Sequence, residues 1–125
     1  AELVIACRPT QISQVLLNLL NNAHDAVAEQ TEKWVKLDVR DLGDSVELSV
    51  TDSGAGIPPE IQEKIMQPFF TTKQIGEGTG LGLSISKGLV DSHHGQLRLD
   101  AKSKNTRFVV LLPKTQQPAD MKGAA

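Results

Sequence analysis

Two asparagines and an aspartate recur at helical spacing near the start of the chain, within residues 18–26 (NLLNNAHDA). At about 100° per residue, Asn18, Asn22 and Asp25 form one stripe beside the apolar face of a helix. Amide oxygens are hard ligands that suit Mg²⁺, a cation that takes few protein ligands. The stretch alone is equally consistent with a metal-binding stripe and with a solvated helix surface.

Residues 52–60 (DSGAGIPPE) carry a carboxylate directly into a glycine-containing turn. Asp52 ends a strand-like alternation, and Gly54 and Gly56 would let the backbone approach a ligand closely. For this stretch by itself, an ordinary turn in which the aspartate caps its own backbone is the simpler interpretation.

A third stretch, residues 76–84 (GEGTGLGLS), has a glycine at every second position from 76 to 82 and leads into a helical pattern. Free N–H groups at the N-terminus of a helix bind phosphate. The spacing is not that of a dinucleotide fingerprint, because Leu81 fills the third glycine position, and a P-loop would need a Gly-Lys-Ser/Thr order that is absent. A glycine-rich loop alone is also often only a hinge.

The elements that must position these stretches follow from the hydrophobic pattern. Apolar residues recur at helical spacing from Ile12 to Val27, and two alternating segments flank an LGDS turn. The run RFVVLLP is continuously apolar, which indicates a strand covered on both faces. The predicted order is a strand at 2–6, a helix to residue 27, a hairpin with one buried face, a helix from Pro58, a loop at 67–80, a helix at 81–95 that Gly95 stops, and strands at 96–102 and 107–113. This order predicts an α/β two-layer sandwich, in which helices cover one face of a mixed sheet.

Composition restricts the class of protein further. The chain has 125 residues, a formal net charge of −2 and one cysteine, Cys7. Nothing in that balance indicates nucleic acid or an anionic membrane surface as a partner, and a lone cysteine suits a reducing compartment. The polar segment 114–125 is expected to be a flexible tail.

Together, the patterns N-x-x-x-N-A, D-x-G-x-G-I and G-T-G-L-G-L-S occur in the order and spacing of the ATP-binding domain of sensor histidine kinases. PFFTTK at 68–73 is similar to their phenylalanine box, and residues 93–113 resemble their last strand pair. The chain thus resembles the GHKL superfamily over residues 2 to about 113, in the style of nitrogen-regulation and oxygen-sensing kinases. The resemblance implies a Bergerat-type fold, a mixed sheet covered on one face by about three helices, with the domain at 1–113.

The resemblance also implies the cofactors ATP and Mg²⁺ and a role for each site residue. Asn22 would ligate Mg²⁺, Asp52 would accept a hydrogen bond from the adenine amino group, and Lys73 would reach a terminal phosphate. Asn18, Asn22 and Lys73 are the expected catalytic residues. The expected nucleotide-contacting residues are Asn22, Asp25, Asp52, Gly54, Gly56, Ile57, Thr71, Thr72, Lys73, Gly78, Thr79, Gly80, Leu81, Gly82, Leu83 and Thr106, among which positions 71–79 form a lid.

Two departures from the family affect these expectations. Asn105 stands where the last strand of the family usually has a glycine before its threonine, here Thr106, and Asp25 stands where many histidine kinases have a basic residue. Hydrolases of the superfamily have a glutamate at the position of Asn18, and an amide cannot accept a proton at neutral pH. We therefore expect ATP to be held without rapid hydrolysis.

The implied function is the ATP-binding catalytic domain of a two-component sensor histidine kinase. It would present the γ-phosphate to a histidine on a separate dimerisation domain and serve a downstream response regulator. His24, His93 and His94 are expected to be structural. The resemblance implies a cytoplasmic domain, compatible with a membrane-anchored bacterial sensor, that itself contacts neither nucleic acid nor membrane. Two alternatives stay open: another GHKL-type protein kinase or ATPase, and a degenerate module that binds partners without nucleotide.

Overall fold

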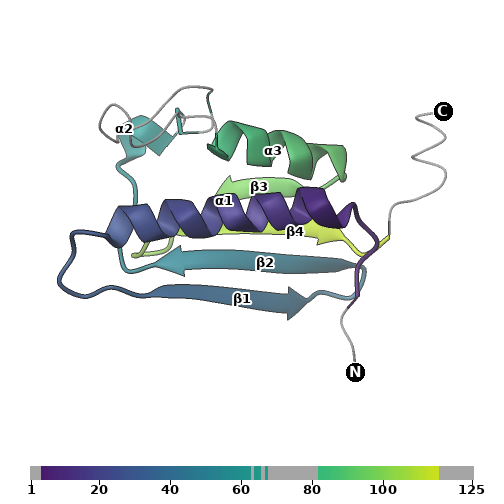
Figure 1. The fold of residues 1–125 in the computed structure, drawn as a ribbon, viewed down its shortest axis with the longest axis horizontal. Helices are drawn as coiled ribbons and strands as arrows, with labels where there is room; N and C mark the ends of the chain where they lie inside the picture. Colours follow the sequence, from purple (N-terminus) through teal and green to yellow (C-terminus); the bar gives the residue numbers. More distant parts are fainter. Residues whose placement is uncertain (1–3, 63, 66, 68–81, 116–125) are drawn as a thin grey trace.

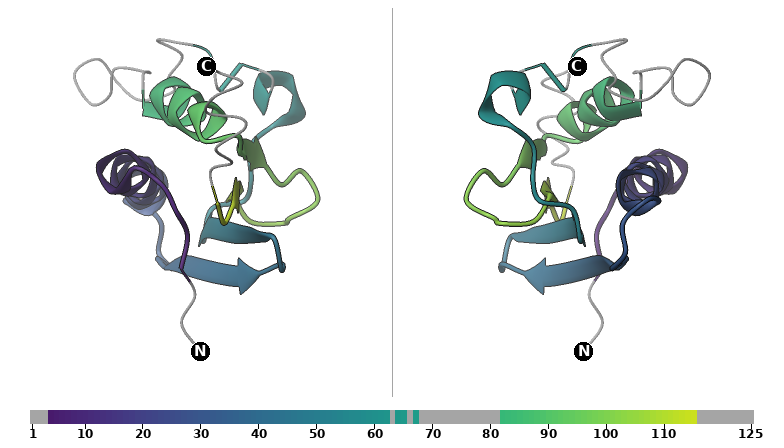
Figure 2. Two further views of the ribbon diagram at one scale, coloured as in Figure 1. Left: turned by 90° about the vertical axis from the view of Figure 1, so that its right-hand side faces the viewer. Right: turned by 90° about the vertical axis from the view of Figure 1, so that its left-hand side faces the viewer.

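A computed structural model describes residues 4–62, 64, 65, 67 and 82–115. Its helices are α1 (Pro9–Val27), α2 (Pro59–Gln62) and α3 (Gly82–Ser92), and its strands are β1 (Val35–Asp41), β2 (Ser45–Asp52), β3 (Gln96–Leu99) and β4 (Arg107–Pro113). Figure 2 shows α1 and α3 above the same face of the sheet. The two-layer α/β arrangement predicted from the sequence is therefore confirmed.

The sheet differs from the prediction in the direction of its strands. Its order is β1-β2-β4-β3, and each neighbouring pair is antiparallel, so within the described residues the sheet is antiparallel rather than mixed. The strand predicted at 2–6 is not formed over residues 4–6. The backbone N–H of Ala6 donates one hydrogen bond to the carbonyl of Lys114, at 2.7 Å. That bond lies beyond the end of β4, which explains why no ladder forms.

Helix α1 begins where the sequence predicts it, with Pro9 in its first turn. One residue per turn is buried along its length, and these residues form the stripe Ile12, Val15, Leu19, Ala23 and Val27. The first four of these residues pack with side chains of β2, α3 and β4 in a single core. Burial of each large apolar side chain contributes about 1.5–3 kcal/mol, which fixes the rotation of α1 about its axis. The polar flank of the helix is fixed with it.

The β1/β2 hairpin forms as predicted, but only β2 has a buried face. Gly43 has a φ of 92° in the connecting turn, and its N–H donates to Oδ1 of Asp41 at 2.9 Å. On β2, Val46 and Val50 are each 2% exposed. On the edge strand β1, by contrast, the apolar side chains stay 39–50% exposed, namely those of Val35, Leu37 and Val39. In the described residues α1 lies mainly over β2, which leaves the inner face of β1 open.

The apolar run of β4 lies at the centre of the sheet and is buried on both faces, as predicted. Phe108 and Val110 point into the helix-covered core. Val109 points to the opposite face, in register with Ser49 of β2 and Arg98 of β3, and is only 1% exposed. A strand that is hydrogen-bonded on both sides and buried on both faces fixes the position of the residues before it, which include Thr106.

Helix α3 ends in a left-handed turn at His94, one residue before the predicted stop. His94 has a φ of 61°, and its N–H donates to the carbonyl of Asp91 at 3.0 Å. The N–H of Gly95 donates to the carbonyl of Val90 at 3.0 Å, which completes a Schellman cap. Gly95 is needed for a different reason, since a Cβ there would overlap the carbonyl oxygen of Leu111 on β4.

Candidate nucleotide-binding site

The amide of Asn18 lies against the first turns of α3. Its Nδ2 donates to Oγ of Ser86 at 3.1 Å and approaches the carbonyl oxygen of Gly82 at 3.4 Å. Because the carbonyl of Gly82 can only accept a hydrogen bond, this contact orients the Asn18 amide. Its nitrogen faces α3 and its oxygen faces away from α3. The side chain predicted for the phosphate end of a nucleotide thus joins α1 to the helix that follows the glycine-rich stretch.

The other two residues of the predicted stripe, Asn22 and Asp25, differ in burial. Asn22 lies one turn after Asn18 and is half-buried. Asp25 is exposed, and its Oδ1 lies 3.5 Å from Nδ1 of the exposed His24. The predicted stripe is therefore present on one flank of α1, but its exposure rises toward the C-terminal end of the helix.

Asp52 is a buried carboxylate at the end of β2, with only 2% of its surface exposed. Its Oδ1 accepts a hydrogen bond from the N–H of Gly54 at 2.7 Å, and its own N–H donates to the carbonyl of Thr106 at 2.9 Å. Burial raises the pKa of Asp52, and the bond from Gly54 partly opposes that rise. A further donor to this carboxylate would therefore relieve part of the cost of its burial.

A different structural constraint explains each of the two glycines after Asp52. A Cβ at Gly54 would lie 2.7 Å from Oδ1 of Asp52 and 3.2 Å from Oγ1 of Thr106, so only glycine fits beside the carboxylate. Gly56 has a φ of 95°, in the left-handed region that glycine adopts without strain. The sequence predicted glycines that let a ligand approach, whereas at Gly54 the nearest group is the aspartate itself.

Thr106 and Asn105 bind this turn from the start of β4. Oγ1 of Thr106 accepts the N–H of Gly56 at 3.2 Å, and its backbone N–H donates to the carbonyl of Gly54 at 3.3 Å. Nδ2 of Asn105 donates to the same carbonyl at 3.1 Å. Sequence reasoning placed Thr106 in the site but missed Asn105, whose departure from the glycine of the family was the available signal.

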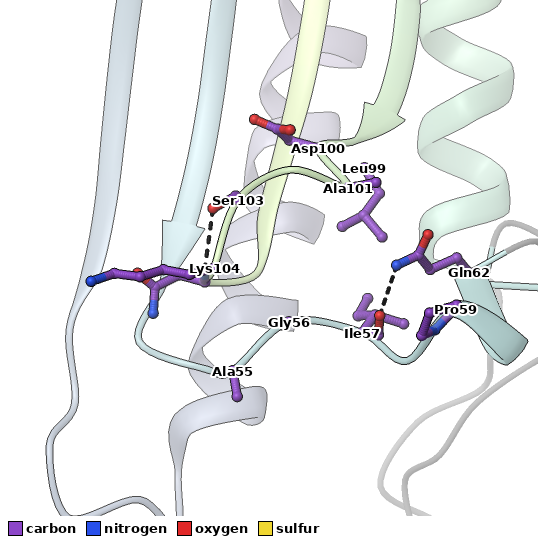
Figure 3. Close-up of a pocket in the computed structure, with 11 residues that line it drawn as sticks. Ala55, Gly56, Ile57, Pro59, Gln62, Leu99, Asp100, Ala101, Ser103 and Lys104 are labelled. Atoms are coloured by element: carbon purple, nitrogen blue, oxygen red, sulfur yellow. Dashed lines mark hydrogen bonds between the residues drawn. The ribbon is translucent and has the colours of Figure 1, made fainter.

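A cavity of about 230 Å³ lies next to this turn (Figure 3). It shares Gly56 and Ile57 with the predicted nucleotide contacts, whereas Asn22, Asp52 and Thr106 do not line it. Its remaining walls come from the turn itself, α2, the end of β3 and the β3–β4 loop, through Ala55, Pro59, Gln62, Leu99, Asp100, Ala101, Ser103, Lys104 and Asn105. The described residues thus do not gather all the predicted contacts in one cavity.

The β3–β4 loop is held in shape by Asp100. Its Oδ1 accepts the N–H of Lys102 at 3.0 Å, and its Oδ2 pairs with Nη1 of Arg107 at 2.8 Å. These two contacts, in that order of importance, lower the pKa of Asp100. The loop therefore reaches Asn105 with a defined geometry.

Of the contacts predicted between residues 71 and 83, the structure describes only the last two. Gly82 is the first residue of α3 and is exposed, and Leu83 is half-buried against the core. The other predicted contacts lie outside the described residues: Thr71, Thr72, Lys73, Gly78, Thr79, Gly80 and Leu81. None of the helices in the described ranges combines the length and the apolar character that a membrane span requires.

The histidines take structural places. His93 is 3% exposed, and its Nε2 accepts the backbone N–H of Arg8 at 3.1 Å. Because Nε2 accepts, Nδ1 carries the hydrogen and donates to the carbonyl of Leu89 at 2.9 Å. His93 was expected to contact a helix dipole, and it also joins two helices. His94 provides the left-handed cap of α3.

Several sensor proteins are similar to this sequence. PprA, a two-component sensor of Pseudomonas aeruginosa, is 42% identical over an alignment of 118 residues that covers 90% of this chain and 13% of PprA. A nucleotide-free catalytic domain of the histidine kinase ThkA matches with a TM-score of 0.79 and 40% identity, over 90% of this chain and 72% of that one. ThkA in complex with the response regulator TrrA matches with a TM-score of 0.75 and 36% identity, over 91% of this chain and 31% of that one.

The chain spans only 13% of the length of PprA and 31% of the ThkA chain in the complex. The family model described as histidine kinase-, DNA gyrase B-, and HSP90-like ATPase matches residues 7–116. That range includes the whole of the sheet, all three helices of the described residues and the turn after Asp52. The chain therefore belongs to this ATPase family, and within it to the catalytic domains of sensor histidine kinases.

Proposed function

We propose that the chain binds ATP with Mg²⁺ and presents the γ-phosphate to a histidine on a separate dimerisation domain of the same protein. The observation that carries the proposal is the buried carboxylate of Asp52. It is fixed at the end of a central strand, with Oδ1 bound to the N–H of Gly54. A buried carboxylate gains most from one more donor, and the adenine amino group is such a donor.

The same carboxylate would select the base. Guanine has a carbonyl where adenine has its amino group. With guanine, two hydrogen-bond acceptors, this carbonyl and the carboxylate of Asp52, would face each other without a proton between them. Gly54, Gly56 and Ile57 would contact the base, and Thr106 would support it through Gly56. The affinity for GTP would be lower than the affinity for ATP for this reason alone.

At the other end of the nucleotide, the amide oxygen of Asn22 would be the single protein ligand of Mg²⁺. In the described residues no three His, Cys, Asp or Glu side chains gather to hold a metal. An amide ligand together with phosphate oxygens and water is the pattern that Mg²⁺ tolerates. When bound, the metal would neutralise phosphate charge. Asp25, Lys73 and the lid residues would complete the contacts.

Asn18 distinguishes kinase from hydrolase in this proposal. An amide whose nitrogen is held toward Ser86 and Gly82 can orient a phosphate or a water, but it cannot remove a proton from water. ATP would therefore persist until a nucleophile from another domain arrives. A response regulator is the proposed downstream partner, supported by the structure of ThkA in complex with one. The proposed location is cytoplasmic.

A titration of the chain with ATP, ADP and GTP, with and without Mg²⁺, tests this function. ATP should bind more tightly than GTP, and Asp52→Asn should weaken ATP binding by about 1–3 kcal/mol, the range for an unpaired buried polar contact. The matched control is Asp38→Asn on the edge strand β1, which should leave the affinity unchanged. Equal affinities for ATP and GTP would contradict the role of Asp52. Absence of nucleotide binding would favour a degenerate module that docks partners.

A further inference from the structure

The side chain of Asn105 reaches from the β3–β4 loop to the turn that follows Asp52. Its Nδ2 donates to the carbonyl of Gly54 at 3.1 Å, across 51 positions of sequence. Its own backbone N–H donates to Oγ of Ser103 at 3.3 Å. The amide is thus presented from a loop residue whose backbone is itself held.

Position 105 does not need the conformational freedom of a glycine. Among the described residues, His94 is the only non-glycine residue with a positive φ, so Asn105 has ordinary backbone angles. An asparagine can therefore occupy this position without strain, and it adds a donor that a glycine lacks.

The contact restrains the most flexible residue of the turn from both sides. The backbone N–H of Gly54 donates to Oδ1 of Asp52. The backbone carbonyl of Gly54 accepts from Nδ2 of Asn105 and from the N–H of Thr106. Both backbone angles of Gly54 lie between these bonds. Glycine loses more freedom than any other residue when it is ordered, so restraint has its largest effect here.

We propose that Asn105 is a positioning residue for the base-binding turn: it holds Gly54, and through it the carboxylate of Asp52, in the binding geometry before a nucleotide arrives. The proposal rests on the proposed function, because it assigns the turn to the base. A turn that is already ordered loses less entropy on binding, and its affinity is higher for that reason. Asn105 need not touch the nucleotide.

Two variants separate the hydrogen bond from the size of the side chain. Asn105→Gly removes the side chain, and Asn105→Asp keeps its size but has no N–H to donate at neutral pH. Both variants should lower the affinity for ATP and the affinity for adenosine by the same factor, about three- to tenfold, because one hydrogen bond at the base end of the site is lost. Lys102→Ala, in the same loop, is the control and should change neither affinity.

Hydrogen exchange in the nucleotide-free chain gives a readout that does not depend on ATP binding. The amides of Gly54 and Gly56 should exchange several-fold faster in both Asn105 variants, while those of β2 and β4 keep their rates. Unchanged exchange at these glycines, or an Asn105→Asp variant that binds like the wild type, would overturn the proposal. If the wild type binds no nucleotide, the proposed function fails, and the exchange rates still decide whether Asn105 orders the turn.

Discussion

The backbone N–H of Arg8 donates a hydrogen bond to Nε2 of His93, at 3.1 Å and 85 positions apart in the sequence. It joins the start of α1 to the end of α3. Midway along α1, Nδ2 of Asn18 donates to Oγ of Ser86 in the second turn of α3, at 3.1 Å. The helix with the proposed metal ligand and the helix that follows the glycine-rich stretch are therefore joined at two separate places along their length.

Replacement of His93 should destabilise the chain. His93→Leu removes two hydrogen bonds and leaves the N–H of Arg8 without this acceptor, so the free energy of unfolding should fall by about 1–3 kcal/mol. Chemical denaturation measures the loss. His24→Leu is the control, since the side chain of His24 is 80% exposed, and it should change stability by less than about 0.5 kcal/mol. Similar effects of the two variants would refute a structural role for His93.

Replacement of Gly95 should be costly because β4 lies against it. A Cβ there would overlap the carbonyl oxygen of Leu111 and lie 2.9 Å from Cδ2 of Leu112, so Gly95→Ala should destabilise the chain by about 1–3 kcal/mol. Gly88→Ala is the matched control within α3, since a Cβ there has no heavy atom within 4 Å. It should stabilise the chain by about 0.5–1 kcal/mol. Thermal or chemical melts of the two variants should therefore shift in opposite directions.

The charge on Asp52 should lower stability at neutral pH. Its pKa in the folded chain is raised above the ordinary value of 3.8, so the folded state binds the proton more tightly than the unfolded state. The contribution of Asp52 to the free energy of unfolding is therefore most favourable below pH 3.8, and it is lost as the pH rises through the pKa of the folded state. Asp52→Asn keeps an acceptor for Gly54 and removes the buried charge.

The stability advantage of Asp52→Asn over the wild type should consequently grow between acidic and neutral pH. Urea unfolding of both proteins over that range measures the difference. A constant difference across the range would show that Asp52 does not titrate with a raised pKa. A variant that is more stable and binds ATP less tightly would show the conflict between stability and function that is common at binding sites.

The isolated chain should bind ATP but neither label itself nor hydrolyse it at a useful rate. His93 is buried between two helices and Asn18 cannot act as a base, so neither is expected to accept the phosphoryl group or to activate a water molecule. Radiolabelled ATP should give no labelled chain, and a histidine-bearing helical-hairpin domain supplied in trans should become labelled. A stable phosphohistidine on the chain alone would show that the acceptor is wrongly assigned. Rapid phosphate release that is lost in Asp25→Asn would instead indicate an ATPase.

The sequence predicted the elements well where side-chain periodicity decides the structure. The apolar spacing from Ile12 to Val27 gave the helix and its buried face, and β4 is buried on both faces as its continuous apolar run indicates. The prediction was wrong where contacts between distant segments decide. Val35, Leu37 and Val39 alternate like a buried strand, yet whether a helix lies over β1 is not encoded in β1.

The candidate site shows the same division. The types and spacing of Asn18, Asn22 and Asp52 identified the polar positions. They could not reveal that Asn18 binds Ser86, or that Asn105 binds Gly54 across 51 positions, because those contacts depend on how α3 and the β3–β4 loop are placed. Likewise, the helix-stop pattern at Gly95 concealed a close contact with β4, and the left-handed residue is His94.

The pairing of β2 with β4 has a consequence for how the chain folds. The β1/β2 and β3/β4 pairs each join strands that are close in the sequence. The central β2/β4 pair, by contrast, places Thr51 beside Arg107 and closes a loop that contains all the residues between these two positions. We expect closure of this loop to be the slow step of folding, because the chain loses conformational entropy before the contacts between β2 and β4 can form. Doubling the length of an enclosed loop costs only about 0.6 kcal/mol. Insertions between α2 and α3 would therefore slow folding slightly and leave the sheet intact, so connections of very different lengths are compatible with one scaffold.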